Sequence, residues 1–287
     1  MNNLFLSSVI ILLLSTSFSL SQENTNNKEQ MNLIETEYAF AETTKNSTVR
    51  DGFLKYIAEE GILFRPNPVN GKEFLTNSEA KPGLLLWYPN YSIVSSSGEM
   101  GVNTGPWEFK QNENDESIAF GQFVTVWEKQ SDDTWKFLID LGISHPKLET
   151  AEEAKINSIV VNVPSDHVQL EYRDIISIEE NFANDIAKNH YLKFADNSTI
   201  ILRNNRFPII DEEVKEFIST LNANIKWETF GGKASINNDL AFTYGKGSAL
   251  DDKFQTVYEF YYLHVWVIEN NQWKLLADVV NEIEEIE

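Results

Sequence analysis

Side chains able to exchange a proton gather on one aromatic stretch near the C-terminus, VYEFYYLHVWVI (residues 257–268). Read as a strand, this stretch turns alternate side chains to opposite faces. One face carries His264 and Tyr262, so the imidazole could take a proton while the phenol donates a hydrogen bond to a developing enolate. The other face carries Glu259, a carboxylate whose pKa an aromatic pocket would raise. His264, Glu259 and Tyr262 are therefore the candidate catalytic residues, and the alternative is that they only pack in the core.

A second set of polar and aromatic residues could contact a ligand. Two of them, Asp140 and Asp278, end the last strand of two similar segments, where they could act as bases or accept backbone N–H groups in a turn. The aromatic members offer apolar surface, although tryptophan more often belongs to a core. The candidate ligand-binding residues are Trp87, Trp107, Gln122, Asp140, Trp227, Tyr244, Tyr261 and Asp278.

Arginines and glutamates recur in step with these candidates. Arg65 and Arg203 each end an expected strand, where they could clamp a ligand carboxylate or form an ion pair within the protein. Four glutamates fall on two expected helices, and we expect them on solvated faces. They are Glu35, Glu37, Glu179 and Glu180.

The composition excludes several classes of function. The 287 residues include 44 acidic and 23 basic side chains, and the formal charge of −21 argues against a nucleic-acid partner. There is no cysteine, and the four histidines lie far apart, so we expect no metal site. The chain also lacks phosphate-loop, dinucleotide, nucleophile-elbow and zinc-protease motifs. We therefore expect no cofactor.

The chain repeats itself with a shift of about 140 residues. The segment 54–65 matches 192–203 without a gap, and both copies end in a tryptophan–turn–tryptophan-lysine hairpin. These matches stay collinear over most of the chain, which chance similarity would not produce. We therefore expect two tandem domains with a linker between them. The expected boundaries are 31–147 for the first domain, 148–171 for the linker and 172–287 for the second domain.

The two copies differ in their candidate chemistry. Where the second copy has an acid or a base, the first has a neutral residue. The repeat aligns Thr125 with His264, Phe123 with Tyr262, Gln122 with Tyr261 and Phe120 with Glu259. At most one copy, the second, could therefore use these groups for acid–base chemistry, and the first would be structural or purely binding.

Each copy predicts helices followed by strands. Leu33, Ile34 and Tyr38 recur at helical spacing in the first copy, and Asp211 is expected to cap a helix in the second. Long β-branched and aromatic runs then predict strands, with a tight hairpin at Asn270–Asn271. This order predicts an α+β fold, in which about three helices pack on an antiparallel sheet in each domain.

The N-terminal residues predict export. The apolar run Leu4–Leu14 is too short to span a bilayer and is typical of the core of a signal peptide. Small residues before Gln22 favour cleavage there, so residues 1–21 are read as a signal peptide and the polar segment 22–30 as a disordered spacer. We expect a periplasmic or secreted protein with no membrane partner after leader removal. The alternative is that the apolar run is an uncleaved anchor or a short buried helix.

Helices followed by a sheet with this terminal hairpin resemble the SnoaL-like branch of the nuclear transport factor 2-like (ketosteroid isomerase-like) superfamily. The stretch GEMGVNTGPWEF (residues 98–109) is the most family-like segment. The resemblance implies two cone-shaped domains, each with three helices closing against a strongly curved sheet and a pocket at the wide end. It also implies that the domains pair through their sheets as an intramolecular pseudo-dimer, and it allows a homo-oligomer.

That superfamily contains enzymes and non-enzymes, so the resemblance leaves two functions open. We expect an exported protein that binds a small apolar or amphipathic molecule, or serves as an assembly module, without catalysis. The alternative is a cofactor-free acid–base enzyme of the isomerase, cyclase or dehydratase type that uses the second domain. An enzyme predicts a deep pocket there with His264 or Glu259 at its floor. A binding or assembly module predicts that these side chains are hydrogen-bonded or face solvent.

Overall fold

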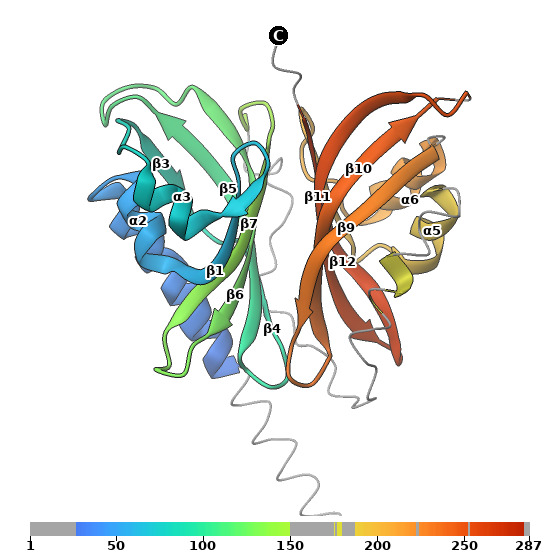
Figure 1. Ribbon diagram of the computed structural model, residues 1–287, viewed down its shortest axis with the longest axis horizontal. Coiled ribbons are helices and arrows are strands. Elements are labelled where there is room, and N and C mark those ends of the chain that lie inside the picture. Colours follow the sequence, from blue (N-terminus) through green and yellow to red (C-terminus); the bar gives the residue numbers. More distant parts are fainter. Residues whose placement is uncertain are drawn as a thin grey trace, which may run out of the picture.

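The structure is a computed structural model that describes residues 27–149, 175, 177–179, 187–221, 224–251 and 253–283. Helices pack against two curved sheets, which confirms the predicted α+β class (Figure 1). The expected signal peptide and residues 150–171 of the expected linker lie outside the described residues. Residues 27–30 of the expected spacer belong instead to a helix, which is anchored because the Gln30 side chain donates a hydrogen bond to the Ser92 carbonyl at 2.6 Å.

The described part of the N-terminal unit (residues 27–149) has three helices and a seven-stranded sheet. The helices are residues 27–45, α2 (Val49–Tyr56) and α3 (Gly71–Asn77). The strands are β1 (Ile57–Phe64), β2 (Pro68–Asn70), β3 (Leu84–Trp87), β4 (Tyr91–Val94), β5 (Met100–Lys110), β6 (Ala119–Lys129) and β7 (Trp135–Ser144). The strands lie in the order β2-β1-β7-β6-β5-β3, and β4 also pairs with β5.

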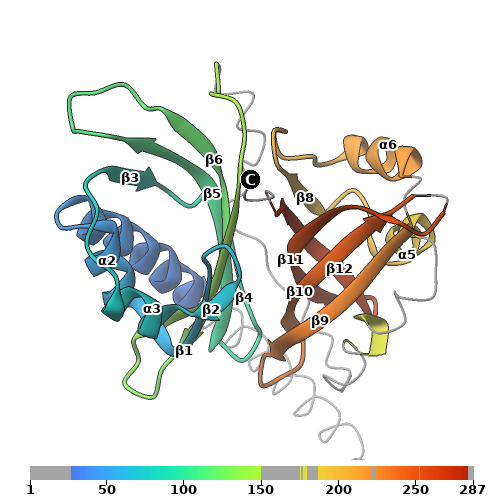
Figure 2. The same cartoon turned by 45° about the horizontal axis from the view of Figure 1, so that its top comes forward.

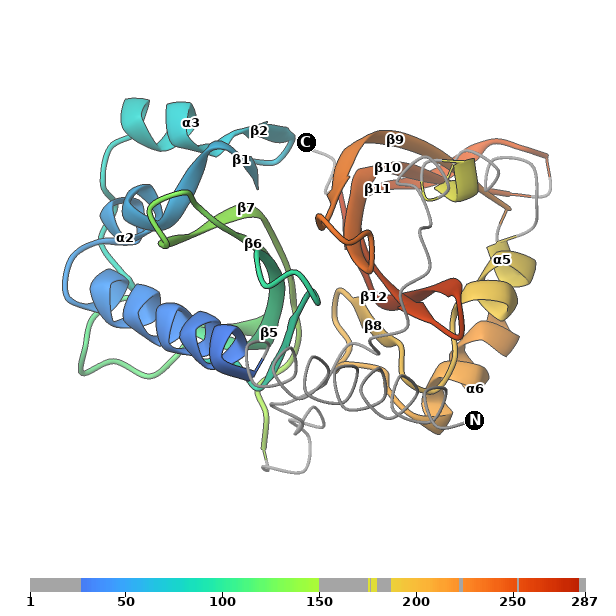
Figure 3. The ribbon, with the colours of Figure 1, turned by 90° about the horizontal axis from the view of Figure 1, so that it is seen from below.

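The first helix lies along its sheet (Figure 3). One stripe of its side chains is buried. Leu33 and Phe40 on this stripe are buried in a cluster with Trp127. Glu37 lies on the same stripe and is also fully buried. Tyr38 does not belong to the buried stripe and is 48% exposed, because it is one position further around the helix.

The C-terminal unit (described residues from 175 to 283) has the same layers. Its helical segments include residues 177–179, α5 (Ala187–Phe194) and α6 (Glu212–Thr220). Its strands are β8 (Ile200–Arg203), β9 (Asn224–Ala234), β10 (Leu240–Leu250), β11 (Thr256–Glu269) and β12 (Gln272–Glu282). They form a five-stranded sheet in the order β8-β12-β11-β10-β9.

Two local predictions in this unit have different outcomes. The hairpin between β11 and β12 is confirmed, since Asn270 and Asn271 both adopt positive φ. The N-cap at Asp211 is wrong, because this residue has a φ of 55° and its side chain makes no capping hydrogen bond. Helix α6 is held instead by its buried side chains Val214 and Ile218.

The two sheets share their strand order and a local irregularity. In each, a strand from before the antiparallel run pairs in parallel with the last strand, β1 with β7 and β8 with β12. The register between the last two strands shifts just before Trp127 in one sheet and just before Trp266 in the other. A bulge at the same place bends both sheets in the same way.

The sheets pack face to face, and helices cover the faces that point away from each other (Figures 1 and 2). In β11, Leu263 and Val265 belong to the apolar cluster that joins the two sheets. Tyr262 and Trp266 belong instead to the cluster under the helices of the C-terminal unit. This alternation shows which face of the strand lines the inside of each cone.

Reciprocal hydrogen bonds join the two units at the β4–β5 and β9–β10 hairpins. The Ser96 amide donates to Asp239 Oδ2 at 2.8 Å, and the Ile236 amide donates to Glu99 Oε1 at 2.6 Å. Each acid therefore caps the hairpin of the other unit. Such an exchange of equivalent contacts is the pattern of a two-fold interface, here within one chain.

Candidate ligand-binding site

The interior of the C-terminal unit holds a buried chain of charged groups. His264 lies between two carboxylates, with its Nδ1 2.8 Å from Glu179 Oε1 and its Nε2 3.3 Å from Asp278 Oδ1. Arg203 continues the chain, because its guanidinium lies 2.5 Å from Asp278 Oδ2. Glu179, His264 and Asp278 are at most 1% exposed. The expected solvated position of Glu179 is therefore wrong.

Charge pairing controls the ionisation of these buried side chains. Burial by itself lowers the pKa of His264, but the charge of Glu179 and hydrogen bonds to both carboxylates raise it to about 9. Burial by itself raises the pKa of Asp278. The positive charges of Arg203 and His264, with their hydrogen bonds, outweigh the effect of burial and hold this pKa well below its usual range. An imidazolium between two carboxylates, with the arginine beyond, is thus the state favoured at neutral pH.

Aromatic rings enclose the imidazole. Its ring centroid lies 4.6 Å from that of Tyr262, 5.2 Å from that of Trp227 and 5.8 Å from that of Trp266. The Tyr262 hydroxyl lies 3.3 Å from Glu179 Oε2, and burial raises the pKa of this phenol. His264 and Tyr262 therefore do meet, as the sequence predicts, but they meet in a packed ionic core.

The structure places the other candidates of this region on the opposite sheet face. The Glu259 carboxylate is 43% exposed and pairs with Lys246 at 2.7 Å, so it does not lie in an aromatic pocket. Tyr244 packs against Phe64 across the interface between the units. The Tyr261 hydroxyl lies 2.5 Å from Asn67 Oδ1, also across this interface.

Gln122 is likewise on the interface side of its own sheet. It is buried, and its amide donates to the Thr104 hydroxyl at 2.9 Å. Its neighbours in the sequence, Phe123 and Thr125, point to the other side. Gln122 is therefore removed from the interior of the cone by the alternation of the strand.

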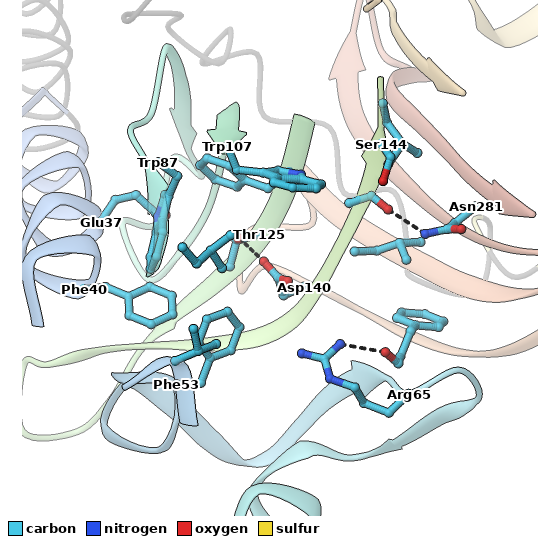
Figure 4. A pocket seen from close by; sticks show the side chains of 17 residues that line it. Glu37, Phe40, Phe53, Arg65, Trp87, Trp107, Thr125, Asp140, Ser144 and Asn281 are labelled. Carbon is cyan, nitrogen blue, oxygen red and sulfur yellow. Dashed lines mark hydrogen bonds between the residues drawn. The ribbon is translucent and has the colours of Figure 1, made fainter. Parts of the chain in front are cut away.

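The N-terminal unit contains a cavity of about 290 Å³ at the corresponding place (Figure 4). One side of the cavity is aromatic, and acidic groups and one arginine lie around the rest. Its lining residues are Glu37, Phe40, Val49, Phe53, Phe64, Arg65, Leu85, Trp87, Trp107, Phe123, Thr125, Asp140, Leu141, Gly142, Ile143, Ser144 and Asn281. Of the candidate ligand-binding residues, the structure brings Trp87, Trp107 and Asp140 together here.

Glu37 reaches the cavity from the first helix and is held by three donors. The Trp87 indole donates to Oε1 at 2.8 Å, and Asn103 and Trp127 donate to Oε2, each at 3.0 Å. Burial raises the pKa of Glu37 to about 7 against these hydrogen bonds, and the nearby charge of Asp140 adds to the rise. The expected solvated position of Glu37 is wrong, because its partners come from three different strands.

Asp140 lies on β7, across the cavity from the helix. It accepts a hydrogen bond from Thr125 Oγ1 at 2.6 Å, and burial raises its pKa although this bond and the charge of Arg65 lower it. Arg65 lies at the exposed rim, where it donates to the Phe64 carbonyl at 2.7 Å. The cavity therefore has two acidic groups with raised pKa values and one cation at its edge.

The C-terminal unit completes this cavity. Asn281, from β12, lines it and donates to the Gly142 carbonyl at 2.7 Å. A second cavity of about 400 Å³ lies beside it at the interface and shares Phe64, Leu141 and Asn281 with it; Tyr261 also lines this second cavity. The site of one unit thus depends on the presence of the other.

Sequence reasoning missed most of this site but contained a signal for it. The repeat pairs Arg65 with Arg203 and Asp140 with Asp278, and it also aligns Glu37 with Glu179. A polar group that recurs at the same place in two copies is a candidate for the interior. Only Thr125, which aligns with His264, breaks the pattern, because threonine is neutral.

Comparisons with known proteins found similar chains among solved structures only. No family model and no curated protein matches the sequence. A candidate ketosteroid isomerase from Parabacteroides distasonis aligns at 12% identity and a TM-score of 0.34, over 44% of this chain and 97% of its own. An NTF2-like protein from Cytophaga hutchinsonii aligns at 16% identity and a TM-score of 0.32, over 40% of this chain and 100% of its own. A protein of unknown function with a cystatin-like fold from Nostoc punctiforme aligns at 11% identity and a TM-score of 0.34, over 41% and 95%.

Within the described residues, no group of three or more His, Asp or Glu side chains could hold a metal ion. In the same part of the chain, no helix is both long and apolar enough to cross a membrane.

Proposed function

We propose that this protein binds a small amphipathic molecule in the cavity of its N-terminal unit. The observation that carries the proposal is a cavity of about 290 Å³ with an aromatic wall and two acidic groups facing it. Apolar surface with a few converging polar groups is the usual composition of a small-molecule site. The volume is near the lower end for such sites, so the ligand has about the size of one substituted ring.

The aromatic wall determines how such a ligand lies. The rings of Phe40 and Trp87 meet edge to face at 4.7 Å, and Phe53 packs against the first of them. These rings are fixed by their mutual contacts and by the hydrogen bond of the Trp87 indole. A flat ligand would stack on a surface that is already ordered, which lowers the entropic cost of binding.

A second candidate function is acid–base catalysis in the same cavity. The observation that favours it is the pKa of about 7 at Glu37, since a general base or acid works best near the working pH. This moves the enzyme alternative from the second domain to the first. In the C-terminal unit, by contrast, His264 is enclosed by rings and carboxylates.

The proposal also includes the localisation of the protein and its origin by duplication of one domain. We infer an exported protein whose leader is cleaved after Ser21, with two tandem SnoaL-like domains at 31–147 and 172–287. The shared strand order and the matching bulge support the duplication. Fractionation of the expressing cells and N-terminal sequencing test the export, and recovery of the uncleaved chain in the cell interior would contradict it.

The binding proposal is tested by blocking the mouth of the cavity. Ser144 is an exposed residue of the lining, so Ser144→Trp should close the site while the fold remains. Single-ring compounds of differing charge are screened by thermal shift, and a bound compound raises the melting temperature of the wild type but not of the blocked variant. Ser131→Trp, in the exposed β6–β7 turn, is the matched control. Equal shifts in all three proteins would place the binding elsewhere and refute the proposal.

A further inference from the structure

We propose that the cavity of the N-terminal unit binds an organic cation, a protonated amine or amidine carried on a ring, at the place which the His264 imidazolium occupies in the C-terminal unit. This inference rests on the proposed function and adds the charge of the ligand to it. Its basis is the comparison of the two units within this chain.

The two sites are equivalent in register. Thr125 lies directly across from Asp140 on the neighbouring strand, and His264 lies directly across from Asp278. Each aspartate is also opposite a residue of the parallel strand, Leu63 in one unit and Ile201 in the other. The arginines Arg65 and Arg203 each follow two positions after that residue.

The glutamates are equivalent through their hydrogen-bond partners. Asn103 pairs with Thr125 across β5 and β6 and donates to Glu37. Thr243 pairs with His264 across β10 and β11 and donates to Glu179 at 2.5 Å. Both units therefore place a helix glutamate, a strand aspartate and an arginine around one central position.

The charges at this position are balanced in one unit only. In the C-terminal unit, His264 and Arg203 offset Glu179 and Asp278. Around the cavity of the N-terminal unit, the titratable side chains are Glu37, Asp140 and Arg65. When both acids are ionised, this site is one positive charge short, since Thr125 is neutral.

The missing imidazole also leaves space. Thr125 is smaller than histidine and lines the cavity together with Glu37 and Asp140 (Figure 4). A ligand in the cavity can therefore reach these two carboxylates, which correspond to those that contact His264 in the other unit. The rings of Trp87 and Phe40 offer faces that attract a cation. An anionic ligand would meet two acids and a single arginine, whose charge already acts on Asp140 by lowering the pKa of that carboxyl. The site is thus suited to a ring with a positive, hydrogen-bond-donating group.

Matched probes separate charge from shape. Benzylamine and benzamidine are cations throughout the range from pH 5.5 to pH 8, whereas benzyl alcohol is neutral and benzoate is an anion. Binding to the full chain is followed by quenching of tryptophan fluorescence and by calorimetry. At pH 8 we expect the cations to bind about tenfold more tightly than benzyl alcohol, and benzoate to bind least.

The preference for a cation should increase as the pH rises. Glu37 loses its proton as the pH rises through about 7, while Asp140 and Arg65 are the other ionisable groups that face it. We expect the affinity for benzylamine to fall severalfold from pH 8 to pH 5.5, while that for benzyl alcohol changes little. An unchanged affinity for benzylamine would contradict the role of the Glu37 charge.

Two variants test the position itself. Thr125→His supplies the absent imidazolium and should abolish benzylamine binding, whereas Ser131→His in the exposed β6–β7 turn should leave it unchanged. Should Thr125→His fail to fold, Asp140→Asn serves, because it removes one negative charge and should reduce benzylamine binding about tenfold without weakening benzyl alcohol.

The outcomes distinguish the two proposals. If benzyl alcohol or benzoate binds as tightly as benzylamine at pH 8 and Ser144→Trp blocks it, the cavity is a binding site but the inferred cation is wrong. If none of the four probes binds to the wild type, the inference fails, and the proposed function fails with it for ligands of one ring. Tight benzylamine binding that survives Thr125→His would also overturn the inference.

Discussion

Thr125 and His264 occupy the same position in the two sheets, each directly across from the aspartate of the last strand. In the C-terminal unit the imidazole spans the interior and touches carboxylates on both sides. In the N-terminal unit the shorter hydroxyl reaches only Asp140, and a cavity remains. The identity of this one side chain thus distinguishes the ionic core of the C-terminal unit from the candidate binding site of the N-terminal unit.

Removal of the imidazolium should destabilise the protein. His264→Thr leaves Glu179 and Asp278 buried without the cation between them, and breaking a buried ion pair in this way costs about 3–5 kcal/mol. Urea unfolding at pH 7 measures the loss in free energy of unfolding. His264→Gln, which keeps much of the volume but no charge, should lose nearly as much. A fully stable His264→Gln would show that packing, and not charge, holds this core.

The same group makes stability depend on pH on the alkaline side. The pKa of His264 is about 9 in the folded protein against an ordinary value of 6.5, so its contribution is complete below pH 6.5 and is lost as the pH rises through 9. The loss is on the order of 3 kcal/mol. Unfolding measured from pH 6.5 to pH 10 should show this decline in the wild type and a smaller one in His264→Gln. Parallel curves for the two proteins would argue against it.

Glu37 should make stability depend on pH nearer to neutrality. Its pKa is raised to about 7 from an ordinary value of 4.5, so its favourable contribution is complete below pH 4.5 and is lost as the pH rises through 7. Glu37→Gln should therefore remove about 3 kcal/mol of the decline in unfolding free energy between pH 4.5 and pH 8. Glu35→Gln, an exposed position on the same helix, is the control and should keep the wild-type decline.

The reciprocal hairpin contacts should stabilise the association of the two units. Asp239 is buried and accepts hydrogen bonds from the Ser96 amide and the Ser235 hydroxyl, so Asp239→Ala should cost about 1–3 kcal/mol in denaturant unfolding. Glu113→Ala removes an acid from the exposed β5–β6 turn and should cost less than about 1 kcal/mol. Equal costs would mean that the contact between the units contributes little to stability.

Local patterns in the chain were sufficient for the fold class. Alternating side chains in residues 257–268 indicate a strand, consecutive asparagines indicate a hairpin, and the order of helices and strands indicates an α+β architecture. These features depend on backbone preferences and on the period of buried side chains, which neighbouring residues determine. The predicted helix cap at Asp211 is wrong because this residue has a φ of 55° and its side chain makes no capping hydrogen bond, which the local sequence pattern does not reveal.

The site could not be derived in this way. Glu37 looks like any helix glutamate in the sequence, and it is buried only because Trp87, Asn103 and Trp127 converge on it from three strands. Likewise, His264 looks like a candidate acid or base in the sequence, but the structure buries its imidazole between Glu179 and Asp278. The amino-acid order by itself predicted two similar helix-and-sheet units with recurring acids and arginines. Whether each recurring group meets a partner, a cavity or solvent was decided by tertiary packing, because burial and electrostatic environment arise from residues that are distant along the chain.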